Sequence, residues 1–329
     1  LRENERLAHT GTGWNPTWHQ PIDVYETADD IVLAVNEAAT NAVDHAYRRT
    51  VTDLTDEALQ RFLGPLDLDL LGLVIGSEGQ LGIVTEALLR LAQPDPPART
   101  VLLALPAFAA VMPVFAALRA RLRLQAFEFF DAVSLAHVVA HGAAAPFTDA
   151  APYYAIADVD AVDDDTLLAA FEHCVGQGWV ADGLIADGSA QAAQLWRLRE
   201  GITEALAPRL PYKNDVVVRT SVMPAFLAEA QALIAAEYPA FEIAWFGHIG
   251  DGNLHINVLK PEAMEQEAFV RACERVTDLL SACLSRHGGS ISAEHGIGLV
   301  KKPYLGATRS AAEIAAMRGI KAALDPAGI

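Results

Sequence analysis

Cysteine and basic residues are both scarce in this 329-residue sequence, and each scarcity excludes a class of protein. The three cysteines, Cys174, Cys273 and Cys283, form no Cys-x-x-Cys pair, which excludes a zinc ribbon and a dithiol redox centre. We expect buried, reduced thiols. Lys and Arg number 24 against 42 Asp and Glu, so the net charge is −18. Because nucleic-acid binding needs a clustered basic surface, we expect no such partner, and any anionic ligand must be held by locally placed cations.

Long apolar runs are also absent. A membrane-spanning helix needs about 20 consecutive apolar residues, and no run in the sequence reaches that length. The first residues show no basic region followed by an apolar core, so no secretory leader is expected and the sequence indicates a cytoplasmic protein. Hydrophobic residues make up 52% of the chain, enough for about two folded domains rather than disorder.

The first third of the chain divides into three kinds of segment. Apolar residues recur at helical spacing over residues 29–49, which predicts one amphipathic helix. Residues 69–86 carry a short apolar run into a glycine-rich turn. Proline denies the backbone its ladder hydrogen bonds, so Gln-Pro-Asp-Pro-Pro at 93–97 predicts a linker. The predicted domains are an N-terminal segment 1–65, a partial cofactor-binding subdomain 66–92 and a catalytic segment 93–329.

Beyond the linker, strand-like and helix-like runs alternate irregularly, without an internal repeat. Strands are predicted at 100–105, 153–158, 216–219, 242–246 and 255–259. Helices are predicted near 108–121, 166–175, 190–207, 226–237 and 268–287. This order favours an α+β fold, an antiparallel sheet with helices covering one face.

Two glycine-punctuated segments carry the strongest chemical signal. Trp245-Phe-Gly-His-Ile-Gly-Asp-Gly-Asn-Leu-His-Ile-Asn257 places His248 and His255 on either side of a turn. Ser290-Ile-Ser-Ala-Glu-His-Gly-Ile-Gly298 ends in Glu294 and His295 against two glycines. Two imidazoles and a carboxylate are a common catalytic metal set that leaves a coordination position for substrate. The plain alternative, hydrogen-bonded polar turn residues, suits a lone histidine better than four ionisable groups in two such segments.

Both segments resemble the signatures of the C-terminal domain of flavin-linked D-lactate, glycolate and D-2-hydroxyglutarate oxidoreductases. The resemblance implies that His248, His255 and Glu294 ligate a divalent metal, zinc above all. It implies that His295 is the catalytic base and that Asn257 binds the substrate. A 2-hydroxy acid would chelate the metal through its hydroxyl and one carboxylate oxygen, and imidazole exchanges protons readily near neutral pH. The hydride from C2 would pass to FAD.

A second cluster resembles the carboxylate clamp of the same family. Arg199 and Thr203 are four residues apart in Trp196-Arg-Leu-Arg-Glu-Gly-Ile-Thr203, so on a helix they share a face. Lys213 follows in Pro211-Tyr-Lys-Asn-Asp215, on the next strand. The resemblance implies that Arg199, Thr203 and Lys213 hold the far carboxylate of a dicarboxylic substrate. A solvated helix face with Arg199 paired to a neighbouring acid is the alternative.

A glycine loop at 76–82 can bring backbone N–H groups close to a cofactor, although an ordinary tight turn is an equal alternative. It resembles the second flavin-contacting segment of the family. The resemblance implies six residues near FAD: Gly76, Ser77, Gly79, Gly82, Ile83 and Val84.

The N-terminal segment differs from the flavin family. No Pro-Gly-Gly type pyrophosphate loop precedes Leu66. Instead the run from Ile31 to Tyr47 resembles the N-box helix of GHKL ATPases of the anti-sigma-factor kinase type, which implies Glu37 as a base and Asn41 as a magnesium ligand. The Asp-x-Gly-x-Gly boxes of that family are missing, so a plain amphipathic helix is favoured over ATPase activity. From these features we expect a chimeric or fragmentary version of the flavin enzyme.

The favoured hypothesis is an FAD-dependent D-2-hydroxyacid dehydrogenase acting on a small-molecule 2-hydroxyacid, with D-2-hydroxyglutarate preferred because of the predicted clamp. The alternative is a non-catalytic module that binds metal and hydroxyacid without flavin. The electron acceptor is unknown, and the oligomeric state is open, with a homodimer as one option.

The missing pyrophosphate loop generates a first prediction. Convergent backbone donors normally compensate the charge of two phosphates, and this acidic chain offers no obvious basic substitute. We expect the chain to purify colourless or with sparse flavin and to oxidise 2-hydroxyacids weakly or not at all. An absorbance spectrum after gel filtration checks this, and a stoichiometric flavin band would contradict it.

Overall fold

The computed structural model describes residues 23–27, 30–34, 49–50, 70–84, 86–89 and 95–328. The chain forms two compact units. Unit 1 contains residues 1–94, 294–302 and 309–329, and unit 2 contains residues 95–293 and 303–308. The break after Pro94 falls inside the proline-rich run. Two stretches of the predicted catalytic segment, 294–302 and 309–329, group with unit 1 instead.

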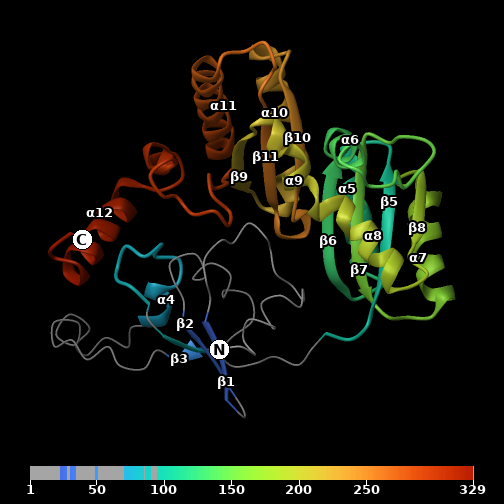
Figure 1. The fold of residues 1–329 in the computed structure, drawn as a ribbon, viewed down its shortest axis with the longest axis horizontal. Helices are drawn as coiled ribbons and strands as arrows, with labels where there is room; N and C mark the ends of the chain where they lie inside the picture. Colours follow the sequence, from blue (N-terminus) through green and yellow to red (C-terminus); the bar gives the residue numbers. More distant parts are fainter. Residues whose placement is uncertain are drawn as a thin grey trace. The chain divides into compact units, whose positions relative to one another are not determined.

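Unit 2 is built on a seven-stranded sheet with the strand order β8-β5-β7-β6-β10-β11-β9, and all neighbouring strands are antiparallel (Figure 1). The strands are β5 (Ala98–Leu105), β6 (Leu124–Asp131), β7 (Tyr153–Asp160), β8 (Asp182–Ile185), β9 (Tyr212–Val217), β10 (Glu242–Gly247) and β11 (Asn253–Leu259). The antiparallel α+β fold predicted from the sequence is confirmed. The strand predicted at 216–219 lies at 212–217, and β6 and β8 were not predicted. The α5–β6 turn contains neither glycine nor proline, so nothing in the sequence marks where β6 begins.

Helices lie between most of the strands. Those of unit 2 are α5 (Val111–Arg119), α6 (Ala132–Ala140), α7 (Asp164–Gly176), α8 (Ser189–Glu200), α9 (Ile202–Leu206), α10 (Met223–Glu237) and α11 (Gln266–His287). Short 3-10 turns are η1 (Phe108–Ala110), η2 (Ala207–Arg209), η3 (Thr220–Val222), η4 (Ile249–Asp251) and η5 (Lys302–Ala307). The helix predicted at 190–207 is interrupted at Gly201, and α6 was not predicted.

Helices cover both faces of this sheet, so the prediction of one covered face is wrong. One core cluster joins β5, β6, β7 and β10 to α6, α8 and α9. On the opposite face Phe127 of β6 packs against Phe115 of α5, and Thr277 of α11 bonds Asn214 of β9. Residues 101–105 of β5 are all buried, and such a continuous apolar run is typical of a strand covered on both sides.

The sheet consists of two similar halves joined edge to edge. In the first half, β5-α5-β6 and β7-α7-β8 give the order β8-β5-β7-β6, the arrangement of a ferredoxin-like split βαβ unit. The second half, β9-α10-β10-β11-α11, repeats it, and Ser290 bridges Val217 of β9 where a fourth strand would lie. β6 and β10 pair only at Phe129 and Phe130. The repeat is structural, because the sequence shows none.

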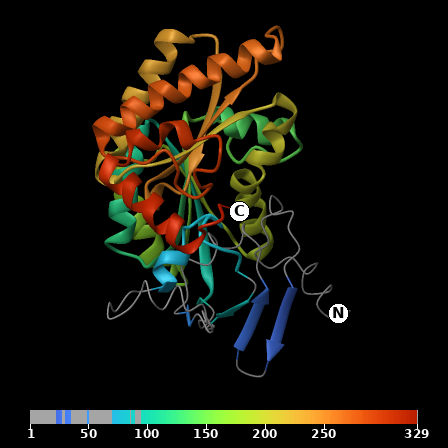
Figure 2. The same ribbon diagram turned by 90° about the vertical axis from the view of Figure 1, so that its left-hand side faces the viewer.

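The described part of unit 1 contains a four-stranded sheet of order β1-β2-β4-β3 and two helices. Its elements are β1 (Asp23–Thr27), β2 (Asp30–Ala34), β3 (Arg49–Thr50), α4 (Leu70–Val74), β4 (Ala87–Leu89) and α12 (Ala311–Leu324). Figure 2 shows β1 and β2 as a blue hairpin.

The helix predicted over 29–49 is wrong at residues 30–34 and 49–50, which are strands. Asp-Ile-Val-Leu-Ala is short, apolar and β-branched, so it can pair with β1 as readily as it can continue a helix. Residues 35–48, and with them Glu37 and Asn41 of the predicted N-box, lie outside the described residues.

Two expectations about the whole chain can be compared with the described residues. Within them, no helix is long and apolar enough to cross a membrane. Cys174, Cys273 and Cys283 are buried and form no disulfide, as predicted.

Asp131, at the end of β6, generates a prediction about stability. Its carboxylate accepts bonds from the backbone and hydroxyl of Ser134 at 2.8 and 2.7 Å and from the Trp245 backbone at 3.1 Å. Burial nevertheless raises the pKa of Asp131 from 3.8 to about 6. Between these values the folded state binds more protons than the unfolded state, so this contribution to stability is lost as pH rises from below 4 to above 6. The Asp131→Asn variant carries no such proton. The unfolding free energy of the wild type minus that of the variant should therefore fall as pH rises through this window, by up to about 3 kcal/mol.

Urea unfolding at several pH values measures this difference. Asp163→Asn is the control, because Asp163 caps α7 in the same way but bonds to Thr166 lower its pKa. The stability contribution of Asp163 is present above its unfolded pKa and is lost only below it. The difference in unfolding free energy between wild type and Asp163→Asn should therefore stay nearly constant from pH 4 to 6. Parallel curves for the two variants would contradict the assignment to Asp131.

Candidate active site

The turn between β10 and β11 brings His248 and His255 together. The N–H of Asp251 bonds the His248 carbonyl at 3.0 Å, and Gly252 follows in the left-handed region with φ +81°. A Cβ at Gly252 would lie 2.0 Å from the carbonyl oxygen of Val218, so only glycine fits there. As a result the two imidazole rings lie 5.5 Å apart between centroids, at 81° to each other.

Each imidazole has a carboxylate facing its Nδ1. His248 Nδ1 bonds Glu128 Oε1 of β6 at 2.6 Å, and His255 Nδ1 lies 3.6 Å from Asp215 Oδ1 of β9. Asp215 is fully buried and Glu128 is 8% exposed. A histidine that donates Nδ1–H to a carboxylate presents Nε2 as its lone-pair nitrogen, the arrangement that surrounds metal-bound histidines. The donor set therefore fits a divalent metal.

Arg199, at the end of α8, lies beside this pair. Its Nε and Nη2 both lie 3.0 Å from Glu128 Oε2, and its guanidinium stands 5.0 Å from the ring centre of Phe246. Phe246 in turn contacts the His255 ring at 5.1 Å between centroids. Arg199 is 8% exposed, so the alternative of a solvated helix face is wrong, although its pairing with an acid is real.

The other predicted substrate residues come from elements that share this face of the sheet. Thr203 lies on α9, one turn after Arg199, and the N–H of Ala205 bonds the Gly201 carbonyl so that the helical path continues. Lys213 of β9 and Asn257 of β11 are direct cross-strand partners, in register with the pair formed by Asp215 and His255. Asn257 is buried and Lys213 is exposed.

Glu294 and His295 belong to unit 1, so their convergence with His248 and His255 stays a prediction. Glu294 Oε1 lies 3.7 Å from His295 Nε2, and both side chains are 46% exposed. The first stretch of unit 2 ends one residue earlier, at Ala293, whose N–H bonds Asp215 Oδ2 at 3.0 Å. Asp215 therefore fixes the backbone directly before the predicted ligand and base.

The predicted flavin loop forms a left-handed turn after α4. Gly76 has φ +74° and Gly79 has φ +71°, and a Cβ at Gly76 or Gly82 would meet no other atom within 4 Å. The Ser77 N–H closes the turn on the Val74 carbonyl. Ile83 is 89% exposed, and Val84 follows it half-buried. Open backbone and an exposed apolar side chain fit contact with a planar cofactor.

Glu78 connects this loop to the His295 segment within unit 1. Its carboxylate accepts the backbone N–H of Ile297 at 2.7 Å and of Gly298 at 2.8 Å. A Cβ at Gly296 would lie 2.8 Å from the Glu78 carboxylate carbon, so glycine allows this close approach. The glycine loop at 76–82 and the segment that contains His295 are therefore in contact within unit 1.

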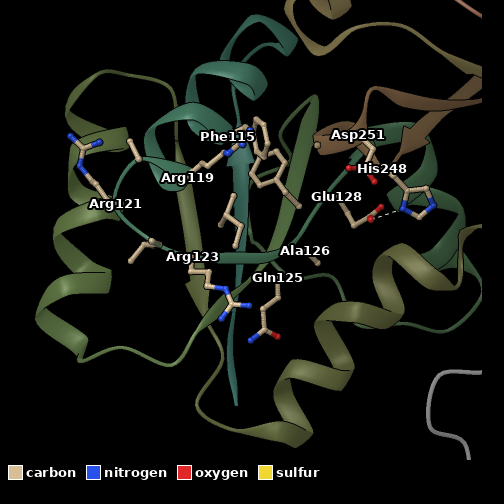
Figure 3. A pocket seen from close by; sticks show the side chains of 14 residues that line it. Phe115, Arg119, Arg121, Arg123, Gln125, Ala126, Glu128, His248 and Asp251 are labelled. Carbon is tan, nitrogen blue, oxygen red and sulfur yellow. Dashed lines mark hydrogen bonds and ion pairs between the residues drawn. The ribbon is translucent and has the colours of Figure 1, made fainter. Parts of the chain in front are cut away.

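A cleft of about 810 Å³ in unit 2 reaches the Glu128–His248 pair (Figure 3). Arg119, Arg121 and Arg123 line it along the turn from α5 to β6, and Asp251 lies beside His248. These arginines are exposed, and Arg123 pairs with Asp160. The cleft gives His248, whose side chain is 40% exposed, access to solvent.

A second cluster of metal-ligand residue types joins α10 to α11 but has the character of an ion-pair network. Glu229 bonds Arg286 at 2.5 Å and His287 at 2.7 Å, and these bonds lower its pKa. Burial raises the pKa of the neighbouring Cys283 to about 11, which disfavours the thiolate a metal needs.

Sequence reasoning missed three residues of the site: Glu128, Asp215 and Phe246. A signal existed for Glu128, an acid inside the apolar run Ala126-Phe-Glu-Phe-Phe130, because an ionised group is buried only with partners. Asp215 is the last residue of the Pro211–Asp215 segment that contains Lys213, but the sequence pattern assigned it no role. Phe246 could not be distinguished from an ordinary core residue.

The fold is an antiparallel α+β domain, and its candidate site combines a carboxylate-supported histidine pair with a buried arginine. Residues 95–329 match the family described as FAD linked oxidases, C-terminal domain, and the chain belongs to this family.

Curated relatives are similar over the same region. D-2-hydroxyglutarate dehydrogenase of Xanthomonas citri pv. viticola is 65% identical over 257 residues, which are 77% of this chain and 54% of the relative. The protein of the same name from Stutzerimonas stutzeri is 46% identical over 265 residues, 79% of this chain and 57% of the relative. The mitochondrial D-2-hydroxyglutarate dehydrogenase of Bos taurus is 35% identical over 277 residues, which are 79% of this chain and 48% of the relative. The chain thus spans about half the length of the curated relatives it matches.

The histidine turn generates a prediction that compares two neighbouring glycines. Gly252→Ala combines a left-handed φ with a Cβ only 2.0 Å from the Val218 carbonyl oxygen, so we expect it to cost at least about 2 kcal/mol and to weaken zinc binding more than about tenfold. Gly250→Ala is the control, because its Cβ would make only ordinary contacts, with the Phe115 ring edge at 3.4 Å and the Phe127 carbonyl oxygen at 3.6 Å. Urea unfolding and a zinc titration measure both effects. Equal behaviour of the two variants would show that the turn does not depend on Gly252.

Proposed function

We propose that this chain provides the substrate-binding and proton-accepting residues for FAD-dependent oxidation of D-2-hydroxyglutarate to the 2-oxoacid. The observation that carries the proposal is the His248–His255 pair, supported by a carboxylate at each Nδ1 and adjoining the buried Arg199. Membership of the FAD linked oxidase family supports the reaction class. The name shared by the 65% and 46% identical relatives supports the substrate.

In this proposal His248, His255 and Glu294 hold a divalent metal, for which two nitrogens and one carboxylate oxygen suit zinc. The metal would act as a Lewis acid toward a 2-hydroxy acid, making its hydroxyl proton easier to remove. His248 and His255 would contribute Nε2, since Nδ1 of each faces a carboxylate. Glu294 follows the Asp215-bound Ala293, so its approach to the metal is constrained by the chain.

The proton and the hydride of the substrate would go to different acceptors. His295 would accept the hydroxyl proton at its imidazole nitrogen as the C2–H bond breaks. When bound, FAD would supply the hydride acceptor, and residues 76–84 would face it. The Glu78 bonds to Ile297 and Gly298 hold the His295 segment against this loop, so base and loop keep a fixed relation within unit 1.

The far carboxylate of the substrate distinguishes D-2-hydroxyglutarate from D-lactate. Arg199 would bind it with N–H groups that Glu128 does not use, and Thr203 and Lys213 would add a hydroxyl and a second charge. Asn257, in register with Lys213, would bind nearer the reacting carbon. A monocarboxylate makes none of the clamp contacts.

Replacing Arg199 tests this assignment. In a flavin-loaded preparation, Arg199→Ala should raise the KM for D-2-hydroxyglutarate by about 10- to 100-fold, because a hydrogen bond to a charged group contributes about 1.5–3 kcal/mol. The KM for D-lactate should change by less than about threefold. Arg197→Ala is the control, since Arg197 lies on the same helix but is exposed. Equal losses for both substrates would show that Arg199 does not bind the far carboxylate, and no oxidation of either by the flavin-loaded wild type would reject the proposed function.

A further inference from the structure

Glu128 connects two groups that have separate roles in the proposed function. Its Oε1 accepts the bond from His248 Nδ1 at 2.6 Å, and its Oε2 accepts the bond from Arg199 Nε at 3.0 Å. We propose that Glu128 is a positioning residue that sets both the metal-facing nitrogen of His248 and the substrate-facing edge of Arg199. This inference rests on the proposed function for the roles of His248 and Arg199, while the contacts themselves are independent of it.

At His248, the bond to Glu128 selects the tautomer of the imidazole ring. A carboxylate can only accept, so a neutral His248 bonded to Glu128 carries its proton on Nδ1 and its lone pair on Nε2. The negative partner also makes the imidazole a stronger metal ligand. Without an acceptor at this place, the ring could rotate or place its proton on Nε2, and either change removes the ligand.

At Arg199, the contact with Glu128 determines which N–H groups remain for the substrate. A guanidinium has five N–H donors, and Oε2 occupies the edge formed by Nε and Nη2. The outer edge, formed by Nη1 and the second N–H of Nη2, is the one left for a carboxylate. The Phe246 ring, 5.0 Å from the guanidinium carbon, supports the plane from one side. Glu128 therefore determines the direction in which Arg199 presents its fork.

The two roles are coupled because one buried carboxylate performs both. Glu128 and Arg199 are each 8% exposed, so the charge of each is compensated by the other rather than by water. A change at Glu128 should therefore affect metal binding and dicarboxylate binding together. A residue that merely stabilised the fold would affect neither at a temperature where the protein stays folded.

Two other described glutamates make the same kind of bridge and provide matched controls. Glu242 pairs with His137 and Arg209 at 3.1 Å each, and Glu229 pairs with His287 and Arg286. Their side chains are 41% and 36% exposed, against 11% for Glu128. None of their partners belongs to the proposed metal or substrate set.

The first measurement is zinc affinity of the chain as it is, by competition with a chromophoric chelator. Glu128→Gln should bind zinc about 10- to 100-fold more weakly than wild type, the usual cost of losing such a supporting carboxylate. Glu242→Gln and Glu229→Gln should stay within about threefold of wild type. Thermal melting shows that each variant is folded at the temperature used. Wild-type affinity in Glu128→Gln would overturn the proposal.

The second measurement needs no metal and follows the tautomer of His248 by ¹⁵N NMR at pH 8, with the signal assigned by its loss in His248→Ala. Wild type should show the proton on Nδ1. In Glu128→Gln the positive Arg199 should keep the amide oxygen, so the amide N–H₂ faces His248 Nδ1 and shifts the proton to Nε2. An unchanged tautomer would overturn the proposal, whether or not the wild type binds zinc. Absence of zinc binding by the wild type would count against the proposed function alone.

The third measurement addresses the arginine side by calorimetric binding of D-2-hydroxyglutarate and D-lactate to the zinc-loaded chain. Glu128→Gln, at zinc concentrations that saturate it, should weaken D-2-hydroxyglutarate at least about tenfold and D-lactate less than about threefold. Glu128→Asp keeps the charge on a shorter side chain and should recover part of the loss. Equal weakening of both ligands would remove the coupling to Arg199.

Discussion

The buried contact of Glu128 with His248 and Arg199 depends on how the two halves of the sheet meet. β6 and β10 pair only at Phe129 and Phe130, and Glu128 directly precedes Phe129, just outside the paired positions. The first half thus supplies the carboxylate, the second supplies the histidine just after β10, and the connecting helix α8 supplies the arginine. Beside this point the charges of Glu128 and Arg199 compensate each other.

The acidic composition has a local counterpart. In a chain of net charge −18, the two best-buried acids of the site, Glu128 and Asp215, are the ones that face imidazoles and backbone N–H groups. Burying a carboxylate is unfavourable unless donors surround it, so these donors become fixed in place. The same logic at the end of β6 gives Asp131 its bonds to Ser134 and Trp245. Carboxylates therefore position backbone and side chains along the whole junction of the two halves.

The sequence predicted the parts of the site that depend on local geometry. A glycine-rich turn between two strands specifies itself, so His248 and His255 could be identified together. Glu128 lies 120 residues from His248 and 71 from Arg199, and no local pattern encodes a contact at that separation. The same limit explains the fold. Most strands and helices beyond the linker were predicted, although β6, β8 and α6 were missed. Asp30–Ala34, an apolar pentapeptide, was assigned to a helix because only its pairing with β1 decides otherwise.

The proposed roles divide between the two units in a chemically consistent way. Unit 2 contains the groups that would recognise the substrate: the histidine pair and Arg199. Unit 1 contains the groups that would receive its proton and hydride: His295 and the loop that faces the flavin. Glu78, in the loop, bonds the backbone of Ile297 and Gly298, which are 219 and 220 residues away in the chain. These bonds hold the His295 segment against the loop. Among the described residues the Glu128 and Glu78 networks share no side chain, so the contacts of one can be changed without removing those of the other.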